Sequence, residues 1–440
     1  MTAIRYSILG FFSASLVAVS ATALFAQTPP ASATTEQSAP TTADAPKPHP
    51  ADLYKQAMQP LDLVRSSLDN WSDTELGALA EGIRQARQEC GQAKPEDYTG
   101  DDLYDLARLC ALGQDWNTTL TIAQTYLASE EQAHRARTYA IAVNALIQTR
   151  SLQQAVEVTR EMLHRLPFDA VVAESAGYLT TYLEHSLDPA AVGLAKEQHS
   201  QLIDALGKGG PLLEINGNDA VNVGELYENA MELAFLERYA NQDDAAAATA
   251  ADVKSALAKL TAISAEDQRL IQAVDTRYGL LGEQVPTIEV AKFMVATTTR
   301  AKILHDDQLA TVYTLFPQWC PQCRKMMKQM TTLAHPPAGA KFLAYGLMIQ
   351  STRAPGEVVP AEDTFKDMQG TPTMLVPQAT AATFGAIEFP LGVVADKTGK
   401  IRYIGTLTTN AFDQRGFIEQ VVNRSSGPRI LLVTQPAPVR

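Results

Sequence analysis

One stretch of the chain decides the fold of its C-terminal part: Phe316-Pro317-Gln318-Trp319-Cys320-Pro321-Gln322-Cys323-Arg324-Lys325. The preceding run, Ala310 to Leu315, has the apolar and β-branched composition of a buried strand. The following run, Arg324 to Leu333, is rich in Met, Lys and Gln and contains no Gly or Pro, so a helix is expected to begin at the second cysteine. The pattern predicts a strand, a turn and a helix, with Cys320 in the turn.

This setting has a chemical consequence for the two cysteines. A thiol at the first turn of a helix lies near unpaired N–H groups and the positive end of the helix dipole, which favour the thiolate and make Cys320 the expected nucleophile. Arg324 and Lys325 add positive charge at the same place. Because only two residues separate the cysteines, Cys323 can close back on Cys320, and the pair can cycle between dithiol and disulfide.

Two other interpretations of the cysteine pair remain. A zinc or copper site normally needs further ligands, and the nearby histidine, His335, stands beside two prolines with no additional cysteine. A purely structural disulfide usually closes a longer loop than this one. Redox chemistry is therefore the favoured interpretation, and neither a metal nor an organic cofactor is expected.

The length and charge of the chain limit the classes of protein to consider. Its 440 residues exceed one ordinary domain, so two or three domains are expected. A composition of 46% hydrophobic and 19% charged residues is typical of a folded protein. The net charge of −13 supplies no basic excess to displace counterions from a phosphate backbone, so no nucleic-acid partner is expected.

The N-terminal segment has the layout of an export signal. Residues 1–26 contain one positive residue, Arg5, then an apolar run and small residues around Ala23 and Ala26, which is typical of a signal peptide. The apolar run is also about as long as a short membrane span, so an uncleaved inner-membrane anchor, with the chain facing the periplasm, is the alternative. Residues 27–50 consist mainly of Ala, Thr, Pro, Ser and Gln and are expected to form a disordered linker. The chain is thus expected to be exported to the periplasm.

The next part of the chain, residues 51–280, is rich in Ala and Leu with helical periodicity, so an all-helical domain is predicted. One helix ends near Cys90, and the next begins near Asp101 and carries Cys110 on its apolar face. In an oxidising compartment these cysteines can form a structural disulfide, which would close a loop of about 20 residues and stabilise the fold by about 3 kcal/mol. Two buried free thiols are the alternative. Three acidic residues of a later helix are expected to form a solvated face: Glu228, Glu232 and Glu237.

A repeat runs through this helical domain. Thr119, Ala155 and Ala191 each follow a helix-ending turn, at a constant spacing of 36 residues. With two helices per unit and a small residue where helices cross, the pattern resembles tetratricopeptide repeats, and the central unit fits best, with Leu163 and Pro167 at matching positions. Such stacks usually bind a protein or peptide, so the domain is expected to recruit partners. A helical spacer or dimerisation unit is the alternative.

Residues 281–426 alternate predicted strands and helices, which implies an α/β fold around one sheet, and residues 427–440 form a C-terminal tail. Four motifs stand in order here: Gly282-x-x-x-Pro286, Trp319-Cys-Pro-x-Cys323, Phe384-Gly-x-x-x-Phe389-Pro390 and the hairpin turn Asp396-x-x-Gly399. Together they resemble the thioredoxin-like fold and, within it, the exported TlpA/ResA-like thiol–disulfide oxidoreductases. The predicted architecture is a multidomain chain, in which an all-α, tetratricopeptide-like helical-repeat domain precedes an α/β thioredoxin-like domain.

The resemblance implies a role for each site residue. Cys320 would be the attacking thiol, Cys323 the resolving thiol, and Pro390 a cis-proline lying against them. An ordinary proline at the start of a strand is the alternative for Pro390. The expected partners are protein dithiol or disulfide substrates and a redox partner protein, with membrane contact only through an uncleaved N-terminal segment. Three further positions are expected to support the site: Trp319, Pro321 and Gln322.

One position departs from the family pattern. Thr314 stands where thioredoxin has a buried aspartate, six residues before the first cysteine. The nearest carboxylate candidate in the sequence is Glu388, for which a solvated surface glutamate is the other interpretation. The function predicted from the sequence is that of an exported thiol–disulfide oxidoreductase acting on protein cysteines through Cys320 and Cys323. The alternative, from another class, is a helical-repeat scaffold whose thioredoxin-like module is redox-inactive.

Overall fold

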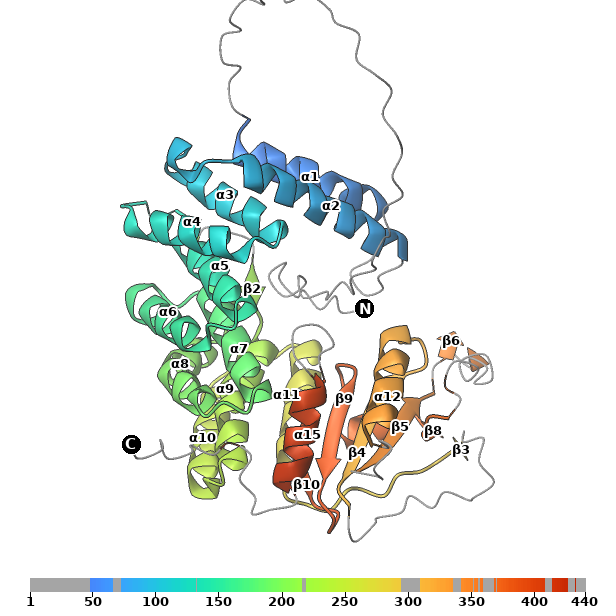
Figure 1. Cartoon of the computed structure of the whole chain (residues 1–440). Helices are drawn as coiled ribbons and strands as arrows, with labels where there is room; N and C mark the ends of the chain where they lie inside the picture. The colour runs from blue at the N-terminus through green and yellow to red at the C-terminus, as the bar shows by residue number, and fades with distance from the viewer. Residues whose placement is uncertain are drawn as a thin grey trace, which may run out of the picture. The chain divides into compact units, whose positions relative to one another are not determined.

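The computed structural model describes most of the chain from residue 48 onward (Figure 1). The described residues are 48–65, 73–131, 133–215, 219–293, 309–334, 342–350, 352–354, 357–358, 368, 370–407, 414–425 and 432. The expected signal peptide, the linker up to residue 47 and the tail apart from Leu432 lie outside them. The chain divides into two compact units, Met1–Arg150 and Ser151–Arg440. None of the helices in the described ranges is long and apolar enough to cross a membrane.

The first unit consists of helices that pack on their neighbours along the chain. They are α1 (Pro50–Val64), α2 (Asp73–Gln92), the short 3-10 helix η2 (Pro95–Asp97), α3 (Asp101–Leu112), α4 (Trp116–Ala128) and α5 (Arg135–Gln148). The apolar face of α3 is fully buried at Leu106, Ala107 and Cys110. A disulfide joins Cys110 to Cys90 of α2, with 5.1 Å between their Cα atoms. The structure thus joins the two cysteines that the sequence suggests as a structural disulfide between neighbouring helices.

The second unit begins with further helices and one small hairpin. The helices are α6 (Leu152–Arg165), α7 (Ala170–His185), α8 (Ala190–Lys208), α9 (Val223–Tyr239), α10 (Asp243–Leu257) and α11 (Ala265–Leu280). Between α8 and α9, strands β1 (Leu212–Leu213) and β2 (Ala220–Val221) pair antiparallel. The small residues at the 36-residue spacing, Thr119, Ala155 and Ala191, are all fully buried near the starts of α4, α6 and α8.

The repeated helices are joined by turns of one kind. The turn residue with positive φ is Gln114 between α3 and α4, Arg150 between α5 and α6, and Leu187 between α7 and α8, with φ of 58°, 59° and 49°. A left-handed residue after a helix lets the chain reverse while the last carbonyls remain hydrogen-bonded. Asn241, with φ of 60°, makes the same turn between α9 and α10, and the sequence spacing gave no sign of this fourth hairpin. The assignment to the tetratricopeptide family stays a prediction.

The last two helices before the sheet are separated by a short connection. Helix α10 ends at Leu257 and α11 begins at Ala265. The Ser264 side chain accepts a hydrogen bond from the N–H of Asp267 at 3.0 Å and donates one to its carboxylate at 2.6 Å. Ser264 therefore caps α11 and satisfies a backbone N–H that the helix itself leaves free.

The rest of the second unit is built around one sheet, in the order β10-β9-β4-β5-β8-β3. The central strand β4 is parallel to β5 and antiparallel to β9. The main elements are β3 (Lys292–Phe293), β4 (Thr311–Pro317), α12 (Pro321–Ala334), β5 (Leu343–Ile349), β8 (Thr373–Val376), α14 (Ala379–Thr383), β9 (Leu391–Ala395), β10 (Ile401–Thr406) and α15 (Gln414–Ser425). A separate pair of short strands, β6 (Thr352–Ala354) and β7 (Glu357–Val358), follows β5.

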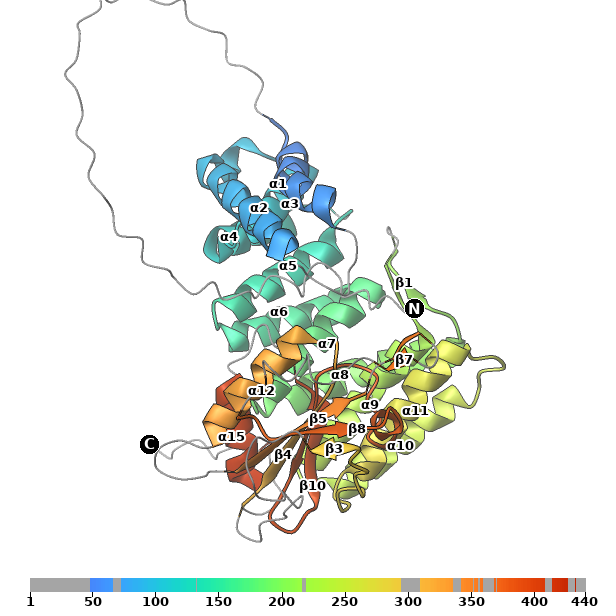
Figure 2. The same ribbon diagram turned by 90° about the vertical axis from the view of Figure 1, so that its right-hand side faces the viewer.

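Strand β4 is buried at every position, which requires cover on both faces of the sheet. Helices α12 and α15 lie together on one face (Figures 1 and 2). At the neighbouring Gly346 of β5, a Cβ atom would lie 3.0 Å from Oγ1 of Thr373 and 3.2 Å from Cε1 of Phe316. The glycine therefore allows the side chains of the adjoining strands to close over β5.

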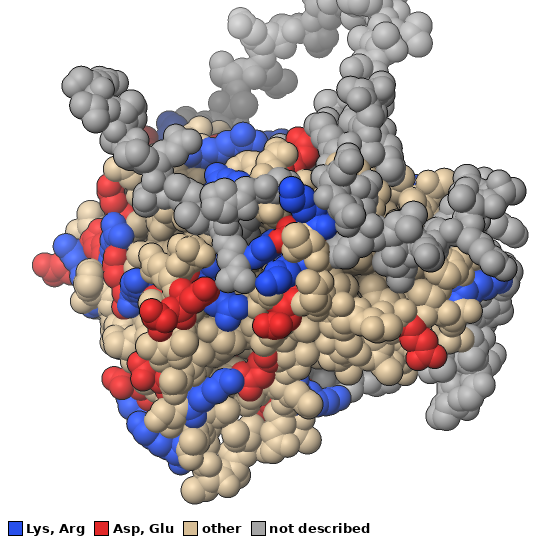
Figure 3. All heavy atoms as spheres, turned by 90° about the horizontal axis from the view of Figure 1, so that it is seen from below, with Lys and Arg blue, Asp and Glu red and all other residues tan. Residues whose placement is uncertain are grey.

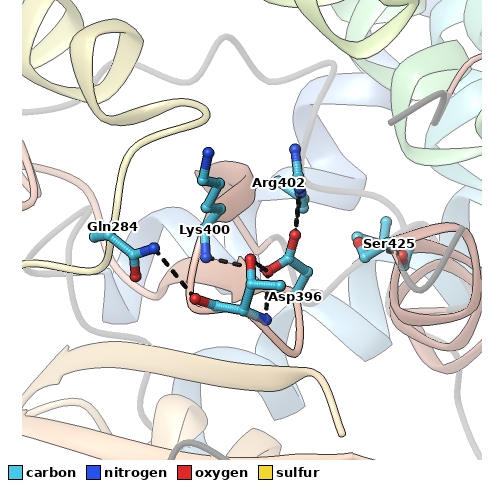
Figure 4. Close-up of polar contacts among 7 residues, drawn as sticks. Gln284, Asp396, Lys400, Arg402 and Ser425 are labelled. Atoms are coloured by element: carbon cyan, nitrogen blue, oxygen red, sulfur yellow. Dashed lines mark hydrogen bonds and ion pairs between the residues drawn. The ribbon is translucent and has the colours of Figure 1, made fainter. Parts of the chain in front are cut away.

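A polar turn joins β9 to β10. The Asp396 carboxylate accepts hydrogen bonds from the Thr398 N–H at 2.8 Å, the Thr398 hydroxyl at 2.7 Å and the Lys400 N–H at 3.1 Å (Figure 4). Arg402 donates a further bond from Nε at 2.6 Å. The side-chain amide of Gln284 donates to the Thr398 carbonyl at 3.2 Å, which ties the segment after α11 to this turn. The predicted Asp-x-x-Gly hairpin is thus a dense hydrogen-bonded cluster.

Aromatic side chains join the helices of the second unit to its sheet. The ring centroids of Tyr239 in α9 and Tyr403 in β10 lie 5.5 Å apart, and those of Tyr403 and Phe417 in α15 lie 5.2 Å apart. His185, the last residue of α7, lies 5.0 Å from Phe417 between ring centroids. The Tyr239 hydroxyl donates to the Ile404 carbonyl at 3.2 Å. Residues 151–280 and the α/β part therefore share a buried core.

Candidate active site

The cysteine pair lies where β4 ends and α12 begins. The carbonyl of Pro317, the last residue of β4, accepts a hydrogen bond from the N–H of Cys320 at 3.1 Å. The carbonyl of Cys320 accepts one from the N–H of Arg324 at 3.3 Å. Because α12 begins at Pro321, Cys320 immediately precedes the helix, where N–H groups are unpaired and the dipole is positive.

The two cysteines differ in their surroundings. They form a disulfide, with 5.4 Å between their Cα atoms. Cys323 is 0% exposed, whereas Cys320 is partly exposed. The N–H of Cys323 donates to Sγ of Cys320 at 3.2 Å, a contact that would stabilise negative charge on this sulfur after the disulfide opens. Cys320 is therefore the sulfur that a partner thiol can reach.

Arg324 holds the turn that leads to Cys320. Its Nη1 donates to the Gln318 carbonyl at 2.8 Å. The Gln318 N–H donates to the Ile349 carbonyl of β5 at 3.3 Å. The turn is thus attached both to the first turn of α12 and to the neighbouring strand, which limits its movement when the disulfide opens or closes.

The supporting residues predicted from the sequence belong to this turn and to the start of α12. Trp319 is 61% exposed beside Cys320, so a large apolar surface adjoins the reachable sulfur. Pro321 is the first residue of α12, a position where the missing N–H of proline costs no helical hydrogen bond. Gln322 follows it in the helix. The side chains of these last two residues lie outside the described atoms.

Pro390 lies at the same end of the sheet as the cysteines. The Phe389–Pro390 peptide bond is cis. Leu391, the next residue, pairs with Leu315 of β4 in the antiparallel register, so Pro390 stands beside the end of the strand that leads to Cys320. Its carbonyl accepts a hydrogen bond from the N–H of Leu407 at 2.8 Å. Pro372, by contrast, leads into β8, and the peptide bond before it is not cis.

The strand before the cysteines carries hydroxyl groups instead of a carboxylate. Thr314 is fully buried, and its Oγ1 has no hydrogen-bond partner among the described residues. The same is true of Thr311 on this strand and of Thr373 on β8. Burial raises the pKa of Tyr313 to about 12, so this phenol is neutral at pH 7. Proton transfer to Cys323 is therefore not supplied by an acidic side chain of β4.

These features define a thioredoxin-like fold. A parallel pair of strands, β4 and β5, lies beside the antiparallel hairpin of β9 and β10. A C-x-x-C pair stands between the central strand and its helix, and a cis-proline precedes β9. The fold assignment rests on this strand order and on the placement of the pair.

Comparison with known proteins finds similarity among solved structures only. No family profile matches the sequence. No curated protein matches it. The chain is similar to StoA from Bacillus subtilis, at 15% identity over 31% of this chain and 98% of StoA, with a TM-score of 0.23. It is also similar to the thioredoxin domain of a thiol-disulfide oxidoreductase from Bacteroides vulgatus, at 16% identity over 32% and 99% of the two chains, with a TM-score of 0.23. A thioredoxin-like protein from Aeropyrum pernix has 16% identity over 27% and 78%, with a TM-score of 0.22.

Sequence reasoning missed a group of buried charges in the second unit. Glu237 was expected on a solvated face, but it is 2% exposed and accepts a hydrogen bond from the Thr249 hydroxyl at 2.7 Å. Glu228 forms an ion pair with Arg277 of α11, with 2.5 Å between Oε1 and Nη2. Burial raises the pKa of Glu232 and thereby disfavours its charged form. Periodicity could not reveal these positions, because the helix that carries the three glutamates is covered on more than one side.

Proposed function

We propose that this chain is an exported thiol–disulfide oxidoreductase that acts on protein cysteines through Cys320 and Cys323. The observation that carries the proposal is the asymmetry of the pair: a partly exposed sulfur at the start of α12 is bonded to a fully buried one. A purely structural disulfide gains nothing from such exposure. A reactive pair needs it, because only the exposed sulfur can meet the sulfur of another protein.

In the reducing direction, the chemistry takes two exchange steps. The Cys320 thiolate attacks one sulfur of a client disulfide, which forms a mixed disulfide and releases the other client sulfur as a thiolate. The Cys323 thiol then loses its proton and attacks Sγ of Cys320, which releases the second client thiolate and forms the Cys320–Cys323 disulfide. The client gains two electrons and the chain loses two, so a redox partner protein must reduce the pair again. The same steps run backwards in an oxidation.

The helical part is proposed to recruit protein partners. Its repeated hairpins present many side chains on their helical surfaces, which suits the recognition of a protein or peptide. On the face shown in Figure 3, basic and acidic side chains of the described residues are interspersed instead of gathering in a single patch. This mixture, with the net charge of −13, supports a protein partner over nucleic acid.

An insulin-reduction assay with a dithiol reductant, combined with a redox titration of the pair, tests the proposed activity. We expect turnover by the exported protein and a measurable potential for the Cys320–Cys323 pair. The alternative, a helical scaffold with a redox-inactive module, predicts neither. N-terminal sequencing of the mature protein tests export, because cleavage removes the first residues, whereas a chain that begins at Met1 retains its anchor.

A further inference from the structure

The segment that ends at Pro390 lies directly against α11 of the helical part. Gly385, with φ of +63°, begins this segment. A Cβ atom on Gly385 would lie 2.3 Å from the carbonyl oxygen of Ala273 and 3.1 Å from Cγ of Arg277. The backbone of the segment is therefore in van der Waals contact with the helix, with no room for a side chain between them. The preceding Phe384 is fully buried.

A charge on α11 acts on the same segment. Arg277 is 5% exposed, and its Nη2 donates to Oε1 of Glu228 at 2.5 Å. Burial alone would lower the pKa of the Arg277 guanidinium, but the Glu228 and Glu388 carboxylates raise it above its ordinary value. Glu388, two residues before Pro390, is half-buried and accepts a long hydrogen bond from the Thr406 hydroxyl at 3.5 Å. It therefore lies within electrostatic reach of the cation on the helix and beside a hydroxyl of β10.

Helix α11 is itself fixed to the other helices. The Tyr227 hydroxyl of α9 donates to Oδ1 of Asp275 at 2.7 Å, and Lys254 of α10 lies 3.1 Å from the same oxygen. The segment after α11 pairs with the hairpin, because the Gly282 N–H donates to the Ile401 carbonyl at 2.8 Å. Contacts with α9 and α10 and with the β9–β10 hairpin thus fix the position of α11. Helix α11 in turn fixes the segment that it contacts.

We propose that Arg277 and Gly385 make α11 a positioning element of the redox site: they hold the segment from Gly385 to Pro390 where a client chain meets Cys320. This inference rests on the proposed oxidoreductase function and adds a second role for the helical part. A client with an extended chain depends on the placement of this segment. A small disulfide, which needs only the Cys320 sulfur, depends on it much less. The ratio of the two catalytic efficiencies is therefore the quantity to measure.

The experiment uses the full chain and two substitutions. Glu388→Gln keeps the shape of the side chain and removes its charge. Arg277→Lys keeps the positive charge but loses the planar guanidinium with its several N–H donors. The controls are Glu266→Gln and Arg269→Lys, which change exposed residues of α11. The substrates are insulin and an aromatic disulfide of low molecular mass, and KM and kcat are measured for each. Thermal unfolding confirms that each variant is folded, and Glu388→Gln decides the outcome if the buried Arg277→Lys variant is not.

For both test variants we expect kcat/KM for insulin, relative to that for the small disulfide, to fall by about tenfold, mainly through KM. The controls keep the wild-type ratio, and Glu388→Asp, which restores a carboxylate, recovers part of the loss. An unchanged ratio in an active protein overturns the positioning role and leaves the oxidoreductase function intact. An equal fall in kcat for both substrates also overturns it, because Glu388 would then act in proton transfer. Wild-type protein that reduces neither substrate overturns the proposed function, and the inference with it.

Discussion

The hydroxyl oxygen of Tyr403 lies 3.4 Å from Nε2 of His185, although 218 positions separate the two residues in the chain. One belongs to β10 and the other ends α7. Phe417 contacts both rings. Burial lowers the pKa of His185 to about 4, so the imidazole is neutral at pH 7 and its Nε2 can accept a hydrogen bond from the phenol. The neutral imidazole of His185 thus joins the helices to the sheet. Because it is buried, its protonation would cost free energy.

His185 should make the stability of the second unit depend on pH. Its pKa is about 4 in the folded chain and near the ordinary 6.5 when unfolded, so protons bind the unfolded state more readily. The stabilisation is fully present above pH 6.5 and is lost as the pH falls towards 4, with a total on the order of 3 kcal/mol. Urea unfolding at several pH values measures it. The His185→Gln variant should lose this part of the pH dependence, whereas the exposed control His164→Gln should keep it. Equal pH dependence in His185→Gln and wild type contradicts the prediction.

The order of attack can be tested by trapping. Cys323→Ser should accumulate a mixed disulfide between Cys320 and a client, because the second exchange step has lost its thiol. Cys320→Ser should trap nothing, since Cys323 is fully buried. Non-reducing gels and mass spectrometry of the adducts measure both. Adducts through Cys323 in the Cys320→Ser variant would reverse the assigned roles.

The disulfide between Cys90 and Cys110 should stabilise the first unit. It spans 20 positions of the sequence, and its removal in a double Cys→Ala variant is expected to lower the free energy of unfolding by about 3 kcal/mol on the chain-entropy model. Peptide mapping of the exported protein under non-reducing conditions should find the linked pair. The insulin-reduction activity should change little at temperatures where the variant is folded. Free thiols at both Cys90 and Cys110 would contradict the prediction.

Asp396 should be the most sensitive position of the β9–β10 turn. Burial alone would raise the pKa of its carboxyl, but hydrogen bonds from Thr398 and Arg402 lower it below the ordinary 3.8. Asp396→Asn loses the charge that pairs with the mostly buried Arg402, so we expect a loss of about 2 kcal/mol at pH 7. The stabilisation is present above pH 3.8 and disappears as the pH falls through the lower folded value. Urea unfolding of this variant at pH 7 and pH 3, beside the exposed control Asp204→Asn, tests both statements. Equal stability of the two variants at pH 7 argues against the role of the turn.

The local part of the structure could be predicted because short-range rules govern it. The run before Cys320 is apolar and β-branched, and β4 is buried at every position. The residues after Cys323 lack Gly and Pro, and α12 continues to Ala334. The hairpin turn at Asp396 depends on contacts within six residues, so its motif can be recognised from the sequence alone. Signals of this kind also locate the repeated hairpins up to α8.

The tertiary structure alone decided which distant residues meet. The sequence determined that Gly385 could take a positive φ, but only the fold places Ala273 of α11 against it. The sequence likewise contains a histidine at the end of a helix and glutamates at helical spacing, and it is the packing of α7, α9 and α11 on the sheet that buries them. Helical or strand periodicity reports how many sides of an element are covered and never by what, because the covering residues come from elsewhere in the chain. The sequence alone therefore identifies the two site cysteines, whereas only the fold shows which residues surround Pro390.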